Sequence, residues 1–163
     1  MKQTSDELAP LQELIERVTR LLECDGITQV TQSHGVIQAL VDDNLPILVN
    51  FVPNQQTKED EYVLQIYFTL SALRTTNLPL LSAHLDELTP HLTLGKLCIL
   101  PGREIGYYHH LPIKISAVPQ AETNFKLSFQ LMLLFLFEFL PYVQRLSEDP
   151  ESITLPLYLA EEE

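Results

Sequence analysis

The feature that most constrains this chain is its longest apolar run, Leu131 to Phe137, inside a segment that we predict to be helical from about Thr123 to Ser147. Every residue of that run is Leu, Met or Phe, so this helix has no polar stripe. A helix that is apolar on all sides is buried on several sides. We expect Pro141 to bend or stop it near Leu140. The most apolar stretch, Phe125 to Leu140, falls short of the roughly 20 apolar residues that a membrane span needs.

An amphipathic helix is predicted near the start of the chain. Its apolar residues recur at helical spacing and share one face: they are Leu8, Leu11, Leu14, Ile15, Val18, Leu21 and Leu22. Proline is tolerated in the first turn of a helix, so the regular part should begin near Ala9 with Pro10 at its first position. Asp25 and Gly26 should end it, because glycine adopts the left-handed conformation of a helix terminus.

A second helix is predicted after Asn77, a good N-cap with Pro79 just inside the first turn. Four leucines fall on one face of this helix: Leu81, Leu85, Leu88 and Leu92. We interpret this leucine row as core first, and as a homodimer or partner surface where the fold leaves it uncovered.

Several of the remaining segments have the residue patterns of β-strands. We expect three strands joined by short polar loops between Ile27 and Leu70, and two more, Lys96 to Leu100 and Ile105 to Leu111, around a turn at Pro101 to Glu104. Short connections favour an antiparallel meander. The order helix, three strands, helix, two strands, helix predicts an α+β fold with a five-stranded, mostly antiparallel sheet and helices at one face and edge.

Length and charge narrow the function class. The 163 residues predict one domain over residues 1–149, followed by an acidic tail at 150–163. Twenty-two acidic against ten basic residues give a net charge of −12. That balance argues against binding to nucleic acid, which needs Lys and Arg to neutralise phosphates, and against attraction to an anionic membrane. The polar N-terminus does not resemble a signal peptide, so we expect a cytoplasmic protein.

No pattern in the sequence predicts a catalytic or metal site. His84 and His91 are seven residues apart rather than four, and neighbours in a strand such as His109 and His110 point to opposite faces. The acidic clusters, Asp42-Asp43 and 59–61, lie in predicted turns where solvated charge is usual. Phosphate-binding glycine loops and CxxC motifs are absent, and Cys24 and Cys98 are best interpreted as small apolar residues. We therefore expect no cofactor, no metal and no enzymatic activity.

The order of elements resembles the type III secretion chaperone-like fold, which dedicated secretion chaperones share with YbjN-type bacterial regulatory proteins. The residues that carry the resemblance lie between Leu80 and Leu146: a leucine-rich helix at 80–85, Leu94-Gly95-Lys96, a hairpin, and Leu111-Pro112-Ile113. The closing Phe139-Leu140-Pro141-Tyr142-Val143 looks more like the YbjN type, whereas the small size and acidity are similar to the chaperones. The loop at 53–61 and the tail after Pro150 match neither pattern.

The resemblance implies a non-enzymatic module that binds another polypeptide in the cytoplasm, as a homodimer. It also implies an alternative, a YbjN-type regulatory or stress-response protein that acts through a signalling partner. Members of the fold pair through the second helix, which is where the leucine row lies.

The tail supplies one further prediction from its residues. Ile153, Leu155, Leu157 and Leu159 alternate with other residues at strand periodicity. Pro156 restricts such a strand to a sheet edge, and the three glutamates that follow would keep the edge soluble. We predict that this segment either covers an edge or groove that a client would use, or is simply a loose chain end.

Overall fold

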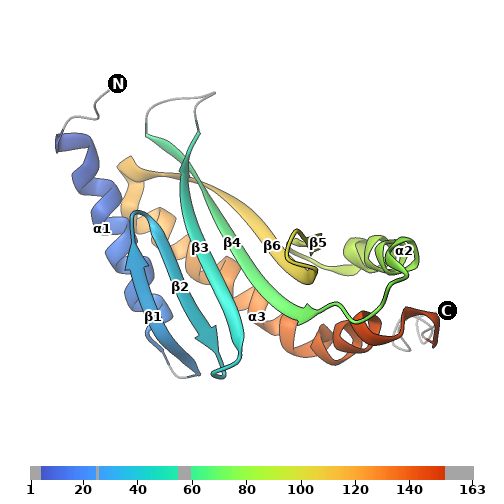
Figure 1. Cartoon of the computed structure of the whole chain (residues 1–163). Helices are drawn as coiled ribbons and strands as arrows, with labels where there is room; N and C mark the ends of the chain where they lie inside the picture. Colours follow the sequence, from blue (N-terminus) through green and yellow to red (C-terminus); the bar gives the residue numbers. More distant parts are fainter. Residues whose placement is uncertain (1–4, 25, 55–59, 153–163) are drawn as a thin grey trace. The chain divides into compact units, whose positions relative to one another are not determined.

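The computed structural model describes residues 5–24, 26–54 and 60–152. The fold is α+β, with six strands hydrogen-bonded in the order β1-β2-β3-β4-β6-β5 and flanked by helices (Figure 1). The elements in chain order are α1 (Ser5–Leu22), β1 (Ile27–Ser33), β2 (Val36–Val41), β3 (Leu45–Pro53), β4 (Glu61–Ala72), α2 (Leu78–Leu88), η1 (Thr89–His91), β5 (Lys96–Leu100), β6 (Glu104–Lys114), η2 (Ile115–Ala117), α3 (Val118–Glu148) and η3 (Pro150–Ser152).

The prediction of an α+β antiparallel fold is confirmed, but the strand count of five was wrong. Four strands, not three, precede α2. The strand missing from that count is β1, whose pairing with β2 shifts register between Thr28 and Thr31, so its alternation is loose. The turn that the sequence indicates at Ser33-His34-Gly35 is present, and the φ angles of His34 and Gly35, 52° and 76°, are both left-handed. Two consecutive left-handed residues make the tight turn that suits the twist of a hairpin, so Ser33 pairs directly with Val36 and the chain reverses within two residues.

The chain divides into two compact units. Unit 1 comprises Met1–Phe68 and His109–Gln130, and unit 2 comprises Thr69–Tyr108 and Leu131–Glu163. Consequently β4, β6 and α3 contribute residues to both units. The expectation of one domain over residues 1–149 stays a prediction.

The core of unit 1 lies on one face of its antiparallel strands. Ile37, Val49 and Ile66 are paired across β2, β3 and β4, and all three are fully buried. The first half of α3 packs on this face, where Phe129 stacks on Phe68 with ring centroids 6.0 Å apart. Helix α1 contacts β1 and η2 and contributes its own apolar face to the core. The buried residues of that face are Leu14, Ile15, Val18 and Leu22.

Unit 2 is built around the β5–β6 hairpin (Figure 1). The Tyr107 hydroxyl donates a hydrogen bond of 2.6 Å to the Leu94 carbonyl, which holds the chain leading into β5 against β6. Gly95 is required beside it, because its φ is +82° and a Cβ there would lie 2.6 Å from the Tyr107 ring. The predicted hairpin turn at residues 101–103 is confirmed.

Helix α2 begins as the sequence predicts. Asn77 is its N-cap, with the side-chain oxygen accepting a hydrogen bond of 3.3 Å from the Leu80 amide, and Pro79 lies in the first turn. At the other end of the unit the chain stays packed beyond the predicted boundary at residue 149. Pro150 is buried, and its carbonyl oxygen lies 3.0 Å from His84 Nε2.

Two predicted helix boundaries were wrong, both at prolines. Helix α1 begins at Ser5 rather than near Ala9, so that Pro10 lies inside it. Helix α3 begins at Val118, beside Pro119, rather than near Thr123, whereas its end at Glu148 agrees with the predicted Ser147 and it continues through Pro141 without the stop that was one of the two outcomes predicted there. A proline removes one backbone hydrogen bond from a helix. In α3 the buried side chains of Phe139 and Val143 on either side of Pro141 hold the helix in its core and offset that loss.

Candidate functional site

The most distinctive surface of unit 2 is a row of large apolar side chains on the outside of α3. Leu131, Leu134 and Phe137 are 39%, 63% and 54% exposed. Residues three apart on a helix lie on one face, so the three follow one another along successive turns. We call these three residues the α3 patch. In unit 1, Leu127 of the same helix is also exposed, at 56%.

The opposite side of α3 is core, so the prediction that this helix is buried on several sides is only half correct. Met132, Leu136, Phe139, Val143 and Leu146 are buried on that side. An all-apolar run leaves open which residues face solvent, because every face of it suits a core. The sequence therefore could not show which residues of α3 are exposed. Its one relevant signal was that this helix contains more apolar residues than a single buried face needs.

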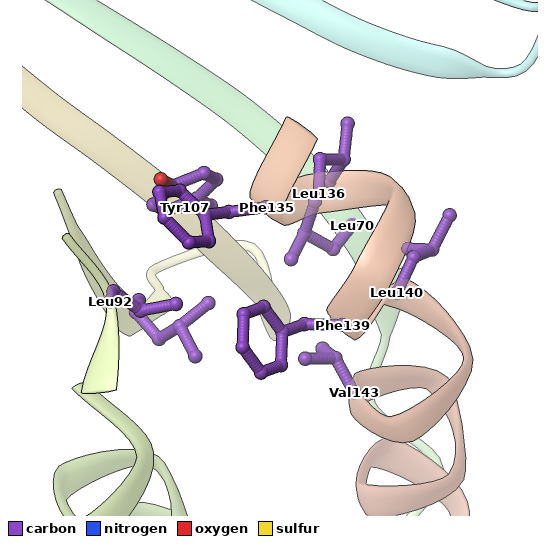
Figure 2. A pocket seen from close by; sticks show the side chains of 9 residues that line it. Leu70, Leu92, Tyr107, Phe135, Leu136, Phe139, Leu140 and Val143 are labelled. Carbon is purple, nitrogen blue, oxygen red and sulfur yellow. The ribbon is translucent and has the colours of Figure 1, made fainter. Parts of the chain in front are cut away.

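The inner face of α3 closes on a small apolar cavity within unit 2. Figure 2 shows Phe135, Phe139 and Val143 pointing into the same space as Leu92 and Tyr107. Its volume is about 10 Å³. A cavity of that size holds at most one water molecule, and here the lining is apolar. We conclude that this is a packing gap in a core and not a ligand pocket. Burial raises the pKa of Tyr107 to about 12.

The predicted partner surface on α2 is instead core. Leu81, Leu85 and Leu88 are 0%, 2% and 1% exposed within the single chain, and Leu92 is half-buried at the small cavity. The leucine row is covered because α2 packs against β5, η1 and η3 of its own unit. A second copy therefore has no access to these leucines without opening unit 2. The predicted edge-strand residues Ile153, Leu155, Leu157 and Leu159 lie outside the described residues.

The charge next to the α3 patch is acidic. Glu138 follows Leu134 by four residues, so it lies on the same face one turn further on, and it is exposed. Among the described residues no ion pair holds Glu138, whereas Glu148 near the end of the helix lies 3.6 Å from Arg74. The α3 patch is thus an apolar row with an available carboxylate beside it.

Unit 1 contains a larger pocket, of about 310 Å³, which the sequence did not predict. Tyr62 and Ile113 are among its apolar lining, and Glu61, Lys114 and Asn124 are among its polar lining. The side chains come from β4, β6 and α3, segments far apart in the sequence, so no local motif marks the site. Its mixed lining resembles an ordinary surface recess more than a catalytic centre.

Two histidines and two acidic turn residues make hydrogen-bonding contacts within the fold. His84 Nε2 contacts the Pro150 carbonyl, and His110 Nε2 lies 3.1 Å from the Tyr67 hydroxyl. Burial and the neighbouring His110 lower the pKa of His109. Asp43 accepts a hydrogen bond from Thr28, and Asp60 from Ser116. Within the described ranges no group of three or more His, Cys, Asp or Glu side chains is arranged to hold a metal ion.

Cys24 is an exposed free thiol and Cys98 a half-buried one. Burial raises the pKa of Cys98, which makes the reactive thiolate form scarcer at neutral pH.

Helix α3 also has the length and composition of a membrane span. Residues Ile115–Glu148 form the one such helix in the described part of the chain, and 33% of its most apolar window is buried. The sequence-based argument that the segment is too short is thus corrected. The core helix of a soluble protein passes the same test, so this property alone does not assign a membrane location.

Comparison with known proteins finds likenesses among solved structures. No family model and no curated protein matches this chain. Among solved structures, a chain of the HopA1-SchA chaperone–effector complex is similar with a TM-score of 0.44 and 14% sequence identity, covering 78% of this chain and 94% of that one. A likeness at that TM-score carries no argument about this chain, and the resemblance to the secretion chaperone-like fold stays a prediction.

Proposed function

We propose that this chain is a non-enzymatic cytoplasmic module that binds another polypeptide through the α3 patch. The observation that carries the proposal is the exposure of Leu131, Leu134 and Phe137 along consecutive turns of one helix. Single exposed apolar side chains are normal on soluble proteins, but a contiguous row of large ones marks an interaction surface. Each of these side chains loses contact with water when a partner covers it, and that burial supplies the binding free energy.

A polypeptide suits this surface better than a small molecule does. The α3 patch is the outside of a helix and therefore convex, whereas small ligands bind in concave pockets that cover most of their surface. A row of side chains three residues apart is the pattern that helix–helix packing uses, because ridges of one helix fit into the grooves of another. The non-enzymatic part of the proposal is supported by the packing roles of the histidines and acidic residues described above.

The test places a photo-crosslinking amino acid at position 134 of the full chain and irradiates it in its native cytoplasm. The matched control carries the same amino acid at Ser82, an exposed residue of α2. We expect a covalent adduct with a discrete polypeptide from position 134 and none from position 82. Equal labelling from both positions, or no adduct from position 134, would contradict the proposal.

A homodimer is part of the proposal, but the α2 leucine row is not its interface. Each copy carries a net charge of −12, so pairing of two copies is opposed by long-range repulsion and should strengthen with added salt. Sedimentation at micromolar concentration should give twice the chain mass of 18.6 kDa at moderate salt. A species of single-chain mass at every salt concentration removes the homodimer from the proposal.

The kind of partner separates the chaperone from the regulator. A secretion chaperone is expected to bind a client encoded beside it, whereas a YbjN-type regulator is expected to bind a signalling protein encoded elsewhere. Sequencing the polypeptide captured at position 134 therefore distinguishes the two by the position of its gene.

A further inference from the structure

Building on the proposed function, we infer that the partner segment which covers the α3 patch is an amphipathic helix with basic residues at the border of its apolar face, one of which pairs with Glu138. The geometry of the row supplies the first half of this inference. Leu131, Leu134 and Phe137 form one ridge, inclined to the axis of α3 as rows of residues three apart are. The complementary shape is a second helix with apolar residues at i, i+3, i+4 and i+7.

Charge supplies the second half. Glu138 lies one turn beyond Leu134 on the same face and has no ion-pair partner in the described part of the chain. A helix packed on the α3 patch would partly remove this carboxylate from water, which is costly unless the partner brings a positive charge. A lysine or arginine at the border of the partner's apolar face removes that cost, and long basic side chains reach such positions easily.

The charge of the whole chain favours the same partner. A net charge of −12 attracts a basic segment and speeds its encounter with the protein. The same charge repels a second copy of this chain and an anionic lipid surface. A basic amphipathic helix therefore fits both the apolar row of the α3 patch and the negative charge of the chain.

The experiment uses three synthetic helix-forming peptides of about 18 residues, long enough to be helical in isolation, with the same leucines, with Lys, Gln or Glu at one position bordering the leucine face, and with Gln at the other polar positions. Fluorescence anisotropy measures the binding of each labelled peptide to the full chain. We expect the Lys peptide to bind at least about threefold more tightly than the Gln peptide, which is the order of one exposed ion pair, and the Glu peptide to bind most weakly. The preference should shrink as salt is added.

Two matched variants assign the preference to one carboxylate. Glu138→Gln should abolish most of the difference between the Lys and Gln peptides. Glu87→Gln makes the same change in net charge at an exposed residue of α2 and should leave the difference in place. If the two variants behave alike, or if the three peptides bind equally to the parent chain, the inference about a basic partner is overturned while the proposed function stands.

A different experimental result would contradict the proposed function itself, which is polypeptide binding at the α3 patch. Leu134→Asp should weaken the binding of all three peptides by about thirtyfold, the size expected for a central apolar contact, while Ser82→Asp at an exposed residue of α2 leaves it within about twofold. If no peptide binds, or if Leu134→Asp binds as the parent does, the α3 patch is not a polypeptide site. Binding of the chain to vesicles of an anionic phospholipid, with none to the Lys peptide, would identify a membrane surface instead and overturn both.

Discussion

Helices α2 and α3 of unit 2 both carry rows of large apolar residues, and the fold treats the rows in opposite ways. On α2 the striped leucines Leu81, Leu85 and Leu88 are buried, although their pattern suggested a surface for a second copy. On α3 the sequence predicts burial on several sides, but Leu134 and Phe137 are more than half exposed. The comparison teaches that an apolar row becomes a docking surface only where the chain has nothing left to cover it.

The largest effect should come from placing a charge in the buried row. Leu85→Asp buries an unpaired carboxylate and should destabilise the protein by about 4–5 kcal/mol, whereas Leu134→Asp should leave the free energy of unfolding nearly unchanged. Urea unfolding followed by circular dichroism measures both. A Leu85→Asp chain that keeps the parent midpoint while a parent dimer dissociates would show that the α2 row is an interface after all.

A second effect tests how rigidly the core beneath α3 is built. Gly95→Ala forces a left-handed φ on a residue with a Cβ and drives that atom into the Tyr107 ring, so we expect a loss of about 3 kcal/mol. Gly102→Ala is the matched control, because its nearest neighbour is 3.6 Å away and its φ is not left-handed, and it should change stability by less than about 0.5 kcal/mol. Equal stability of the two variants would mean that the hairpin shifts freely.

A third effect appears only at high pH. The pKa of Tyr107 is raised from 10.0 to about 12, so the unfolded state loses this proton first and stability falls as pH rises from 10 to 12. The loss attributable to Tyr107 is about 2.5 kcal/mol. Burial also raises the pKa of Tyr142 and of Cys98, in the same direction.

Tyr107→Phe is the variant that isolates this contribution. It removes the hydrogen bond to Leu94 at all pH values, but its stability should fall less steeply than that of the parent above pH 10. Thermal unfolding at a series of pH values measures the slope. Parallel slopes for parent and variant would show that Tyr107 ionises as readily in the folded chain as in the unfolded one.

The smallest effect concerns the start of α2. Asn77→Ala removes the side-chain cap on the Leu80 amide and a hydrogen bond of 3.1 Å to Glu151, and should cost about 1 kcal/mol. Thr76→Ala changes an exposed residue next to it and should cost less than about 0.5 kcal/mol. If the two variants are equally stable, the position of α2 is set by its buried leucines alone.

Features that depend on a few adjacent residues were predicted correctly from the sequence. The N-cap at Asn77 and the turn at 101–103 lie where they were predicted, because each depends on the preferences of a few adjacent residues. The strand count failed at β1, where a register shift between Thr28 and Thr31 interrupts the alternation that marks a strand. At Pro141 the burial of Phe139 and Val143 outweighed a local helix breaker, so α3 continues without the stop that was one of the two predicted outcomes.

The sequence by itself determined the class of fold, the antiparallel pairing and the net acidity of the chain, since these follow from periodicity and charge along the chain. Which apolar row meets solvent was decided only by the tertiary structure. A leucine on α2 and a leucine on α3 have the same side chain, and both belong to rows with helical spacing. Whether a leucine is covered depends on elements that lie elsewhere in the sequence. Strand β5 and η3 pack against α2 and help to cover its leucines, whereas Leu134 of α3 stays exposed to solvent.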